Sequence, residues 1–128
     1  MTQALLAWGP AVTWAAVLFL LSEAQGASSP TWIPASDKVA HFGLYAVLGG
    51  TLAWAGFRGR LQAAGPLLGL GMLYGALDEM HQGFVPGRDP SLGDWIADAV
   101  GVMVGFLVLR FLLGRPGSAP GNNTNRNH

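Results

Sequence analysis

Residues 92–113 read LGDWIADAVGVMVGFLVLRFLL, and this stretch combines the length of a membrane helix with a polar start. A helix of about 20 apolar residues crosses the ~30 Å hydrocarbon core of a bilayer. Gly101 and Gly105 lie one helical turn apart, which gives a small-residue face suited to close packing against another helix. Asp94 and Asp98 continue that stripe with a similar spacing. If the glycines pack inward, the two carboxylates are carried inward with them.

Three further apolar segments have a similar length, at about Ala4–Leu21, Lys38–Phe57 and Leu61–Gly83. The composition agrees with a membrane location, because 51% of the residues are hydrophobic and only 11% are charged, against about a quarter charged in soluble domains. Most of the 19 glycines lie inside these runs, as in closely packed membrane helices. The sequence therefore predicts an all-α polytopic membrane protein with four transmembrane helices.

The connections between these segments are short, so consecutive helices are expected to be antiparallel neighbours in one bundle. This arrangement sorts the charges between the two ends of the bundle. The acidic residues all fall at the end where the second and fourth helices begin: Glu23, Asp37, Asp78, Glu79, Asp89, Asp94 and Asp98. The basic residues that flank the helices are Arg58, Arg60, Arg110 and Arg115 at the other end, and Lys38 and Arg88 at the acidic end. The positive-inside rule then predicts that both termini are cytoplasmic, with residues 115–128 as a disordered cytoplasmic tail.

Composition and motifs exclude several classes of protein. The net charge of +0 provides no basic surface for nucleic acid, and the absence of cysteine excludes disulfides and thiolate chemistry. The chain has no nucleophile elbow, Walker A loop or His-Glu-x-x-His zinc motif. We therefore expect no resident cofactor or metal. Zinc or another divalent ion remains a minor alternative, because five side chains have suitable ligand atoms: His41, His81, Glu79, Asp94 and Asp98.

Polar side chains gather near the acidic ends of the second, third and fourth segments. Asp37, His41 and Tyr45 recur every four residues and share one helical face. Glu79 and His81 lie close to the end of an apolar segment, where an ionisable group is a functional hypothesis by default. The candidate ligand-binding residues are Asp37, Lys38, His41, Asp78, Glu79, Gln82, Arg88, Asp94 and Asp98.

Some of these residues have simpler interpretations. Asp37 is suited to cap the second helix, and Asp94 favours a helix start through the helix dipole. Lys38 and Arg88 are long enough to reach the membrane surface or to neutralise nearby acids. The sequence alone leaves these interpretations beside the functional ones.

Three strings in this order resemble the VanZ-like family: Asp37-Lys38-x-x-His41-Phe42, Asp78-Glu79-x-His81-Gln82-x-Phe84-x-Pro86-Gly87-Arg88 and Ser91-x-x-Asp94-x-x-x-Asp98-x-x-Gly101. The family is named for a bacterial protein associated with teicoplanin resistance. The resemblance implies a multi-pass protein of the bacterial inner membrane, with a VanZ-like transmembrane domain over residues 1–114, but no established reaction. Asp98 departs from the asparagine that is frequent in the family, so the resemblance does not imply that a carboxylate is required there.

Three functional hypotheses follow. In the first, the protein recognises or handles a lipid or a lipid-linked cell-envelope precursor at an extracytoplasmic polar pocket, with a link to glycopeptide resistance suggested by the resemblance alone. Arg88 would hold a phosphate through its planar donors, and Lys38 would add a second positive charge. Carboxylates such as Glu79 would pair with these bases, or bind an amine or a sugar hydroxyl.

The second hypothesis is a membrane-embedded hydrolase or transferase acting on an envelope lipid. Glu79 or His81 would be the general base, and His41 would be a general acid or an orienting group. The third hypothesis is a structural accessory protein, in which the polar groups form a satisfied network that fixes helix register.

Overall fold

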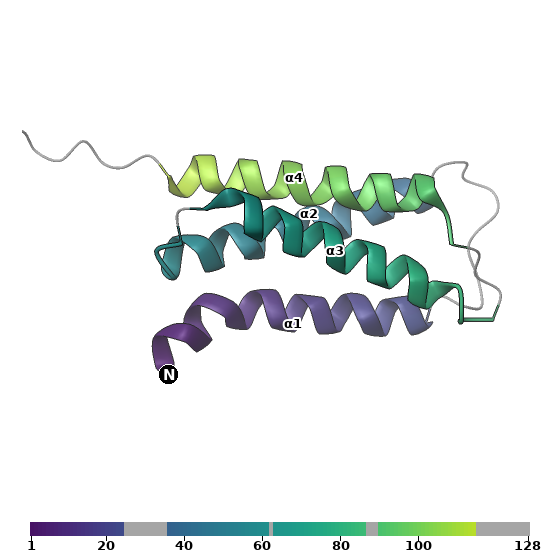
Figure 1. Cartoon of the computed structure of the whole chain (residues 1–128), viewed down its shortest axis with the longest axis horizontal. Coiled ribbons are helices and arrows are strands. Elements are labelled where there is room, and N and C mark those ends of the chain that lie inside the picture. The colour runs from purple at the N-terminus through teal and green to yellow at the C-terminus, as the bar shows by residue number, and fades with distance from the viewer. Residues whose placement is uncertain (25–35, 62, 87–89, 115–128) are drawn as a thin grey trace, which may run out of the picture.

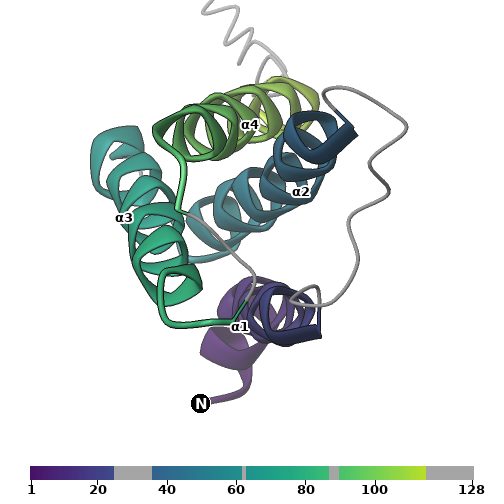
Figure 2. The ribbon, with the colours of Figure 1, turned by 90° about the vertical axis from the view of Figure 1, so that its right-hand side faces the viewer.

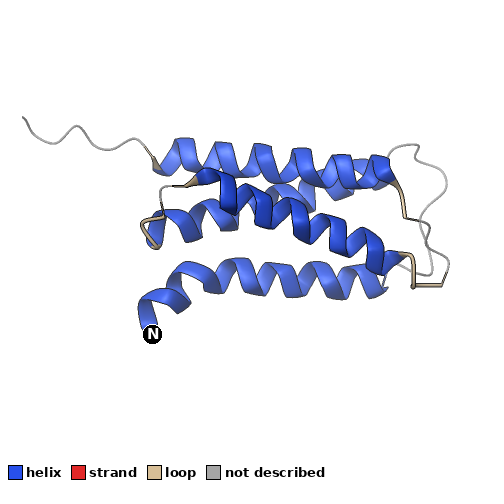
Figure 3. Cartoon of the chain, in the orientation of Figure 1, coloured by secondary structure: helices blue, strands red, loops and turns tan. Residues whose placement is uncertain are grey.

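The computed structural model describes residues 1–24, 36–61, 63–86 and 90–114, and within these ranges its regular secondary structure is entirely helical (Figures 1 and 3). The helices are α1 (Thr2–Ala24), α2 (Ser36–Arg58), α3 (Ala64–Gln82) and α4 (Leu92–Leu113). This confirms the predicted all-α fold, and the fourth helix has the predicted bounds. The expected tail at 115–128 lies outside the described residues.

Helix α2 lies at the centre of the bundle, where it packs against the other three helices (Figure 2). Its largest interface is with α4, which is not its neighbour in the sequence. Helix α1 packs against the opposite side of α2 and touches α3 more sparsely. The start of α1 and the end of α4 lie at the same end of the bundle (Figure 1), as expected for helices that alternate in direction.

Glycines allow the backbones of α2 and α4 to touch. A Cβ atom added at Gly105 would overlap the carbonyl oxygen of Ala46, and one added at Gly49 would overlap the carbonyl oxygen of Val102. A Cβ atom added at Gly101 would likewise overlap the backbone of α2, at the carbonyl oxygen of Phe42. The small-residue face of α4 thus packs inward as predicted, and its partner is α2.

The third helix begins three residues later than predicted because the chain makes a tight turn after α2. Leu61 donates its backbone N–H to the Gly56 carbonyl at 2.8 Å, and Arg60 donates to the Phe57 carbonyl at 3.4 Å. This is the pattern of a Schellman motif, in which one residue is left-handed and is usually glycine. Here that residue is Arg60, with φ 56°.

The outer surface of the bundle is apolar, as a bilayer requires. Large side chains such as Leu5, Val12, Leu107 and Phe111 are exposed. Among the described helices, three are long and apolar enough to cross a membrane, namely α1, α2 and α4. Helix α3 does not meet the same criterion, because its last turns carry two carboxylates, a histidine and a glutamine. The chain therefore has the helices of a membrane protein.

A proline and a tryptophan define how α1 contacts α2. Pro10 lies inside α1 and has no N–H to donate to the carbonyl of Leu6, four residues earlier. The indole Nε1 of Trp54 donates to that same carbonyl at 3.0 Å. The first turns of α1 bend away from the rest of the helix (Figure 1), as expected near a proline. A side chain of α2 thus replaces the backbone donor that Pro10 removes.

Candidate functional site

Polar side chains are buried together at the end of the bundle where α2 and α4 begin and α3 ends. Each is at most 9% exposed, although its helix is otherwise mainly apolar. We call this set the buried polar cluster: His41, Tyr45, Asp78, Glu79, Gln82, Asp94 and Asp98. Five of these seven were predicted as ligand-binding residues on α3 and α4, and His41 was predicted on α2.

The centre of the cluster joins three helices. His41 of α2 lies with its Nδ1 atom 2.7 Å from Oδ1 of Asp98 on α4, a distance made possible by the close approach of the two helices. The same Nδ1 atom lies 3.9 Å from Oε1 of Glu79 on α3. The other oxygen of Glu79 accepts the backbone N–H of Ser91 at 3.1 Å. This hydrogen bond orients the Glu79 carboxylate towards His41.

Two oxygen atoms at this centre lack a hydrogen bond. Oε1 of Glu79 and Oδ2 of Asp98 are buried and have no hydrogen-bond partner among the described residues. Buried polar atoms are nearly always paired, so each exception needs an explanation. A bound proton, a donor group or a cation would satisfy these oxygens.

A second part of the cluster is hydrogen-bonded within the protein. Tyr45 donates its hydroxyl to Oδ2 of Asp78 at 2.8 Å, and Gln82 donates to the same oxygen at 3.4 Å. Gly75 leaves room for this arrangement, since a Cβ there would lie 3.3 Å from the Tyr45 ring and 3.2 Å from Cβ of Asp98. These contacts hold α2 and α3 in register.

A small cavity opens beside this network. It has only about 20 Å³ of space for the centre of a water molecule, which is room for about one water. It is lined by Leu18, Leu21, Ser22, Ala40, His41, Leu44, Tyr45, Asp78 and Gln82. A headgroup larger than water therefore has to bind above this cavity rather than inside it.

The edge of the cluster carries its lysine. Lys38 has a side chain that is 56% exposed, and its Nζ atom lies 3.4 Å from Oδ1 of the buried Asp94. Ser91 caps α4 by accepting the backbone N–H of Asp94. Lys38 thus lies beside the buried polar cluster, and Asp94 is both part of the helix start and part of the cluster.

Three other predicted residues are not part of the cluster as described. His81 points towards α1, where it pairs with Glu23 and its ring lies 5.1 Å from that of Phe19. It is therefore separate from the His41 centre. The side chain of Asp37 and the whole of Arg88 lie outside the described residues.

Two residues near the site were not among the predicted site residues. Tyr45 shares the helical face of His41 and fits its interpretation as a packing residue with a hydrogen-bonded tip, because it is 1% exposed and donates its hydroxyl to Asp78. Ser22 is 5% exposed and lines the small cavity. Nothing in the first segment indicated Ser22, because an isolated serine near a helix end is common.

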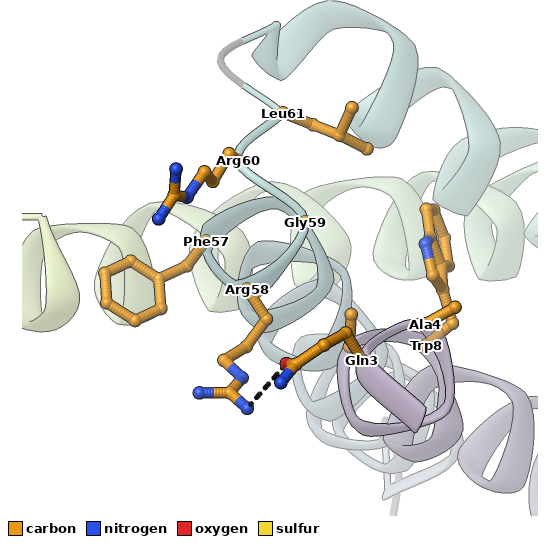
Figure 4. A pocket seen from close by; sticks show the side chains of 9 residues that line it. Gln3, Ala4, Trp8, Phe57, Arg58, Gly59, Arg60 and Leu61 are labelled. Atoms are coloured by element: carbon orange, nitrogen blue, oxygen red, sulfur yellow. Dashed lines mark hydrogen bonds between the residues drawn. The ribbon is translucent and has the colours of Figure 1, made fainter. Parts of the chain in front are cut away.

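A larger hollow lies at the opposite, basic end of the bundle (Figure 4). Its walls come from the start of α1 and from the turn after α2, and include Trp8, Phe57 and two arginines. Arg58 donates to Oε1 of Gln3 at 3.4 Å, while its guanidinium group lies 5.7 Å from the centre of the Trp54 ring. Aromatic rings beside basic side chains are typical of a membrane–water interface.

Together, the apolar helices and the buried polar cluster at one end of the bundle define a helical membrane protein. A family model described as VanZ/LLP1 matches residues 6–113, and the chain belongs to this family. The match confirms the resemblance seen in the three sequence strings. No curated protein and no solved structure matches the chain in the corresponding comparisons.

Proposed function

We propose that this chain is a multi-pass protein of the bacterial cytoplasmic membrane that recognises a lipid or a lipid-linked cell-envelope precursor. The observation that carries the proposal is the buried polar cluster at one end of a bundle whose outer surface is apolar. Ionisable groups at this depth are costly and tend to mark functional sites. An amphiphile would place its headgroup at the cluster and its chains along the exposed apolar side chains.

The proposed orientation follows from the charges at the two ends. Arg58, Arg60 and Arg110 lie at the end that holds the start of α1 and the end of α4. The positive-inside rule favours this end for the cytoplasm. With all four helices crossing the membrane, the buried polar cluster faces the extracytoplasmic side, where cell-envelope precursors are used.

The chemistry of the cluster favours a headgroup with hydroxyl or amine donors. Asp98 and Glu79 each have a buried oxygen with no hydrogen-bond partner in the described part of the chain, which such a donor would satisfy. Lys38 is exposed at the edge and supports binding of a phosphate beside the carboxylates, a role that the sequence also assigns to Arg88. Because the cavity is small, the headgroup would lie over its mouth and insert only a terminal group.

A second candidate is a membrane-embedded hydrolase or transferase. It is favoured by the pairing of His41 with Asp98 at 2.7 Å, because a carboxylate that orients an imidazole is common in acid–base catalysis. Glu79 lies close enough to His41 to exchange a proton through a water molecule. Since His81 faces α1, Glu79 and His41 are the residues for this role.

Lipid mass spectrometry distinguishes the candidates. Wild type, Arg88→Ala, Glu79→Gln and Arg60→Ala would be reconstituted with bacterial envelope lipids and lipid-linked precursors. We expect one lipid class to co-purify with wild type and with Arg60→Ala, the matched control at the basic end, and to be lost in Arg88→Ala. Equal loss in both arginine variants would reveal unspecific attraction to anionic lipid and would refute the proposal.

The Glu79→Gln variant tests the enzyme. If wild type forms a product that Glu79→Gln does not form, the protein is an enzyme and the lipid-recognition proposal is wrong. If no lipid is enriched and no product is formed, the structural accessory hypothesis is favoured instead.

A further inference from the structure

Three potential metal ligands converge at the centre of the buried polar cluster, one from each of three helices. His41 of α2, Glu79 of α3 and Asp98 of α4 each offer a ligand atom, and these atoms all lie within 4.8 Å of one another. The three residues are 6%, 6% and 1% exposed. Such burial distinguishes them from the exposed acidic groups that occur on many protein surfaces.

Among the described residues, the charges at this centre are unbalanced. Two carboxylates face one imidazole, and Oε1 of Glu79 and Oδ2 of Asp98 have no hydrogen-bond partner among the described residues. Lys38 does not fill this gap, because it pairs with Asp94. An uncompensated buried charge is strongly destabilising. A proton shared between the two carboxyl groups or a divalent cation would compensate this charge, and only the cation would use all three side chains as ligands.

We propose that His41, Glu79 and Asp98 bind a divalent metal ion, with zinc as the best match. One imidazole nitrogen and two carboxylate oxygens suit zinc, whereas calcium and magnesium favour all-oxygen sites. Three protein ligands leave one position of a tetrahedral zinc open for water or a ligand group. The site would thus be an open one, and one of its ligands, His41, also lines the small cavity.

The observed spacing fits such an ion after small side-chain movements. Ligand atoms about 2 Å from a tetrahedral zinc lie roughly 3.3 Å from each other. The observed separations of His41 Nδ1 are 2.7 Å from Oδ1 of Asp98 and 3.9 Å from Oε1 of Glu79, one shorter and one longer than this value. Metal binding would replace the hydrogen bond between His41 and Oδ1 of Asp98, and a turn of the Asp98 carboxyl group would bring Oδ2 to the ion. The hydrogen bond from the Ser91 backbone to Glu79 would act as an outer partner that orients the ligand.

The sequence expectation of no metal centre rested on the lack of a compact motif. A site assembled from α2, α3 and α4 has no short spacing by which it could be recognised. The metal inference does not depend on lipid recognition, because metal binding can be measured with no lipid ligand present.

The test is metal binding by the full chain in detergent, after stripping with a chelator. Zinc alone would be titrated against a chromophoric competitor, and metal content would be measured by mass spectrometry. We expect about one zinc per chain in wild type, and at least ~100-fold weaker binding in Asp98→Asn, since changes to outer partners alone cost about 10–100-fold. Asp94→Asn is the matched control, because Asp94 is also a buried carboxylate of the cluster but pairs with Lys38.

A second measurement, made on zinc-loaded wild type alone, provides an independent check. X-ray absorption at the zinc edge should report one imidazole and oxygen ligands only. Two imidazoles would point to His81 and overturn the assignment. If wild type binds no stoichiometric zinc, the assignment is also overturned. Equal loss of zinc binding in Asp94→Asn and in a folded Asp98→Asn would overturn it as well.

Discussion

Replacing Gly105 by alanine tests whether backbone contact between α2 and α4 holds the fold together. The added Cβ would overlap the carbonyl oxygen of Ala46 and lie 2.8 Å from its Cα, where ordinary contact begins at 3.4 Å. Relief requires the helices to separate by roughly 1.5 Å at this level. Overpacking of this kind costs about 1–3 kcal/mol, and the better helix propensity of alanine offsets about 1 kcal/mol. We expect a net loss of up to about 2 kcal/mol.

The matched control is Gly43→Ala on α2. Gly43 is exposed, and a Cβ there would meet nothing within 4 Å, so this variant should be as stable as wild type or up to about 1 kcal/mol more stable. Both variants would be unfolded in mixed detergent micelles and followed by circular dichroism. Because His41 and Asp98 belong to the same two helices, zinc binding should weaken in Gly105→Ala and persist in Gly43→Ala. If the two variants are equally stable, close backbone contact between α2 and α4 does not hold the fold together.

Two further predictions concern the opposite end of the bundle. Trp54→Phe should destabilise the protein by about 1 kcal/mol, because it removes the donor to the Leu6 carbonyl. This loss of stability should be smaller in a Pro10→Ala background, where a backbone N–H can donate to that carbonyl instead. A double-mutant cycle that shows no coupling between the two positions would contradict this prediction. Arg60→Gly should stabilise the protein by about 1 kcal/mol, since Arg60 occupies the left-handed region at φ 56°, where glycine has no Cβ penalty. Thermal unfolding in detergent would measure this change in stability. A lower unfolding midpoint in Arg60→Gly would show that the arginine side chain stabilises the turn by more than its backbone strain costs.

The sequence predicted the helices well because their ends carry clear signals. Helix α4 begins after Ser91, which caps it, and its apolar run continues to Leu113, so its bounds were correct. The start of α3 was placed too early because Leu61 is apolar, and apolarity does not reveal the left-handed turn at Arg60. Patterns of polarity locate segments, while the turn depends on backbone angles that an arginine seldom adopts.

Which helices pack together was harder to predict from the sequence than where the helices begin and end. Gly101 and Gly105 predicted a face that packs closely, but not which helix would cover it. In the structure α2 covers this face, and its Gly49 lies against the backbone of α4. Gly71 of α3 instead faces side chains, because a Cβ added there would lie 2.6 Å from Cγ1 of Val102. A small-residue face specifies close approach without specifying a partner.

The position of His81 shows the limit of spacing arguments within one helix. His81 follows Glu79 by two residues, which corresponds to a rotation of about 200° around the helix. With Glu79 facing His41 in the interior, His81 has to face elsewhere, and it meets Glu23 of α1. The sequence placed both residues near the end of the third helix, and only the packing of α1 against α3 decided that they serve different contacts.

The hydrogen bonds divide the carboxylates of the cluster into two groups. Asp78 is paired with Tyr45, and Asp94 with Lys38, so a network that fixes helix register accounts for both. Glu79 and Asp98 each retain a buried oxygen that has no hydrogen-bond partner in the described part of the chain. A purely structural network gains nothing from such atoms, because an unpaired buried oxygen costs about 1–3 kcal/mol or more. The structural hypothesis therefore explains the first group, and the second group is where a bound ion or headgroup would act.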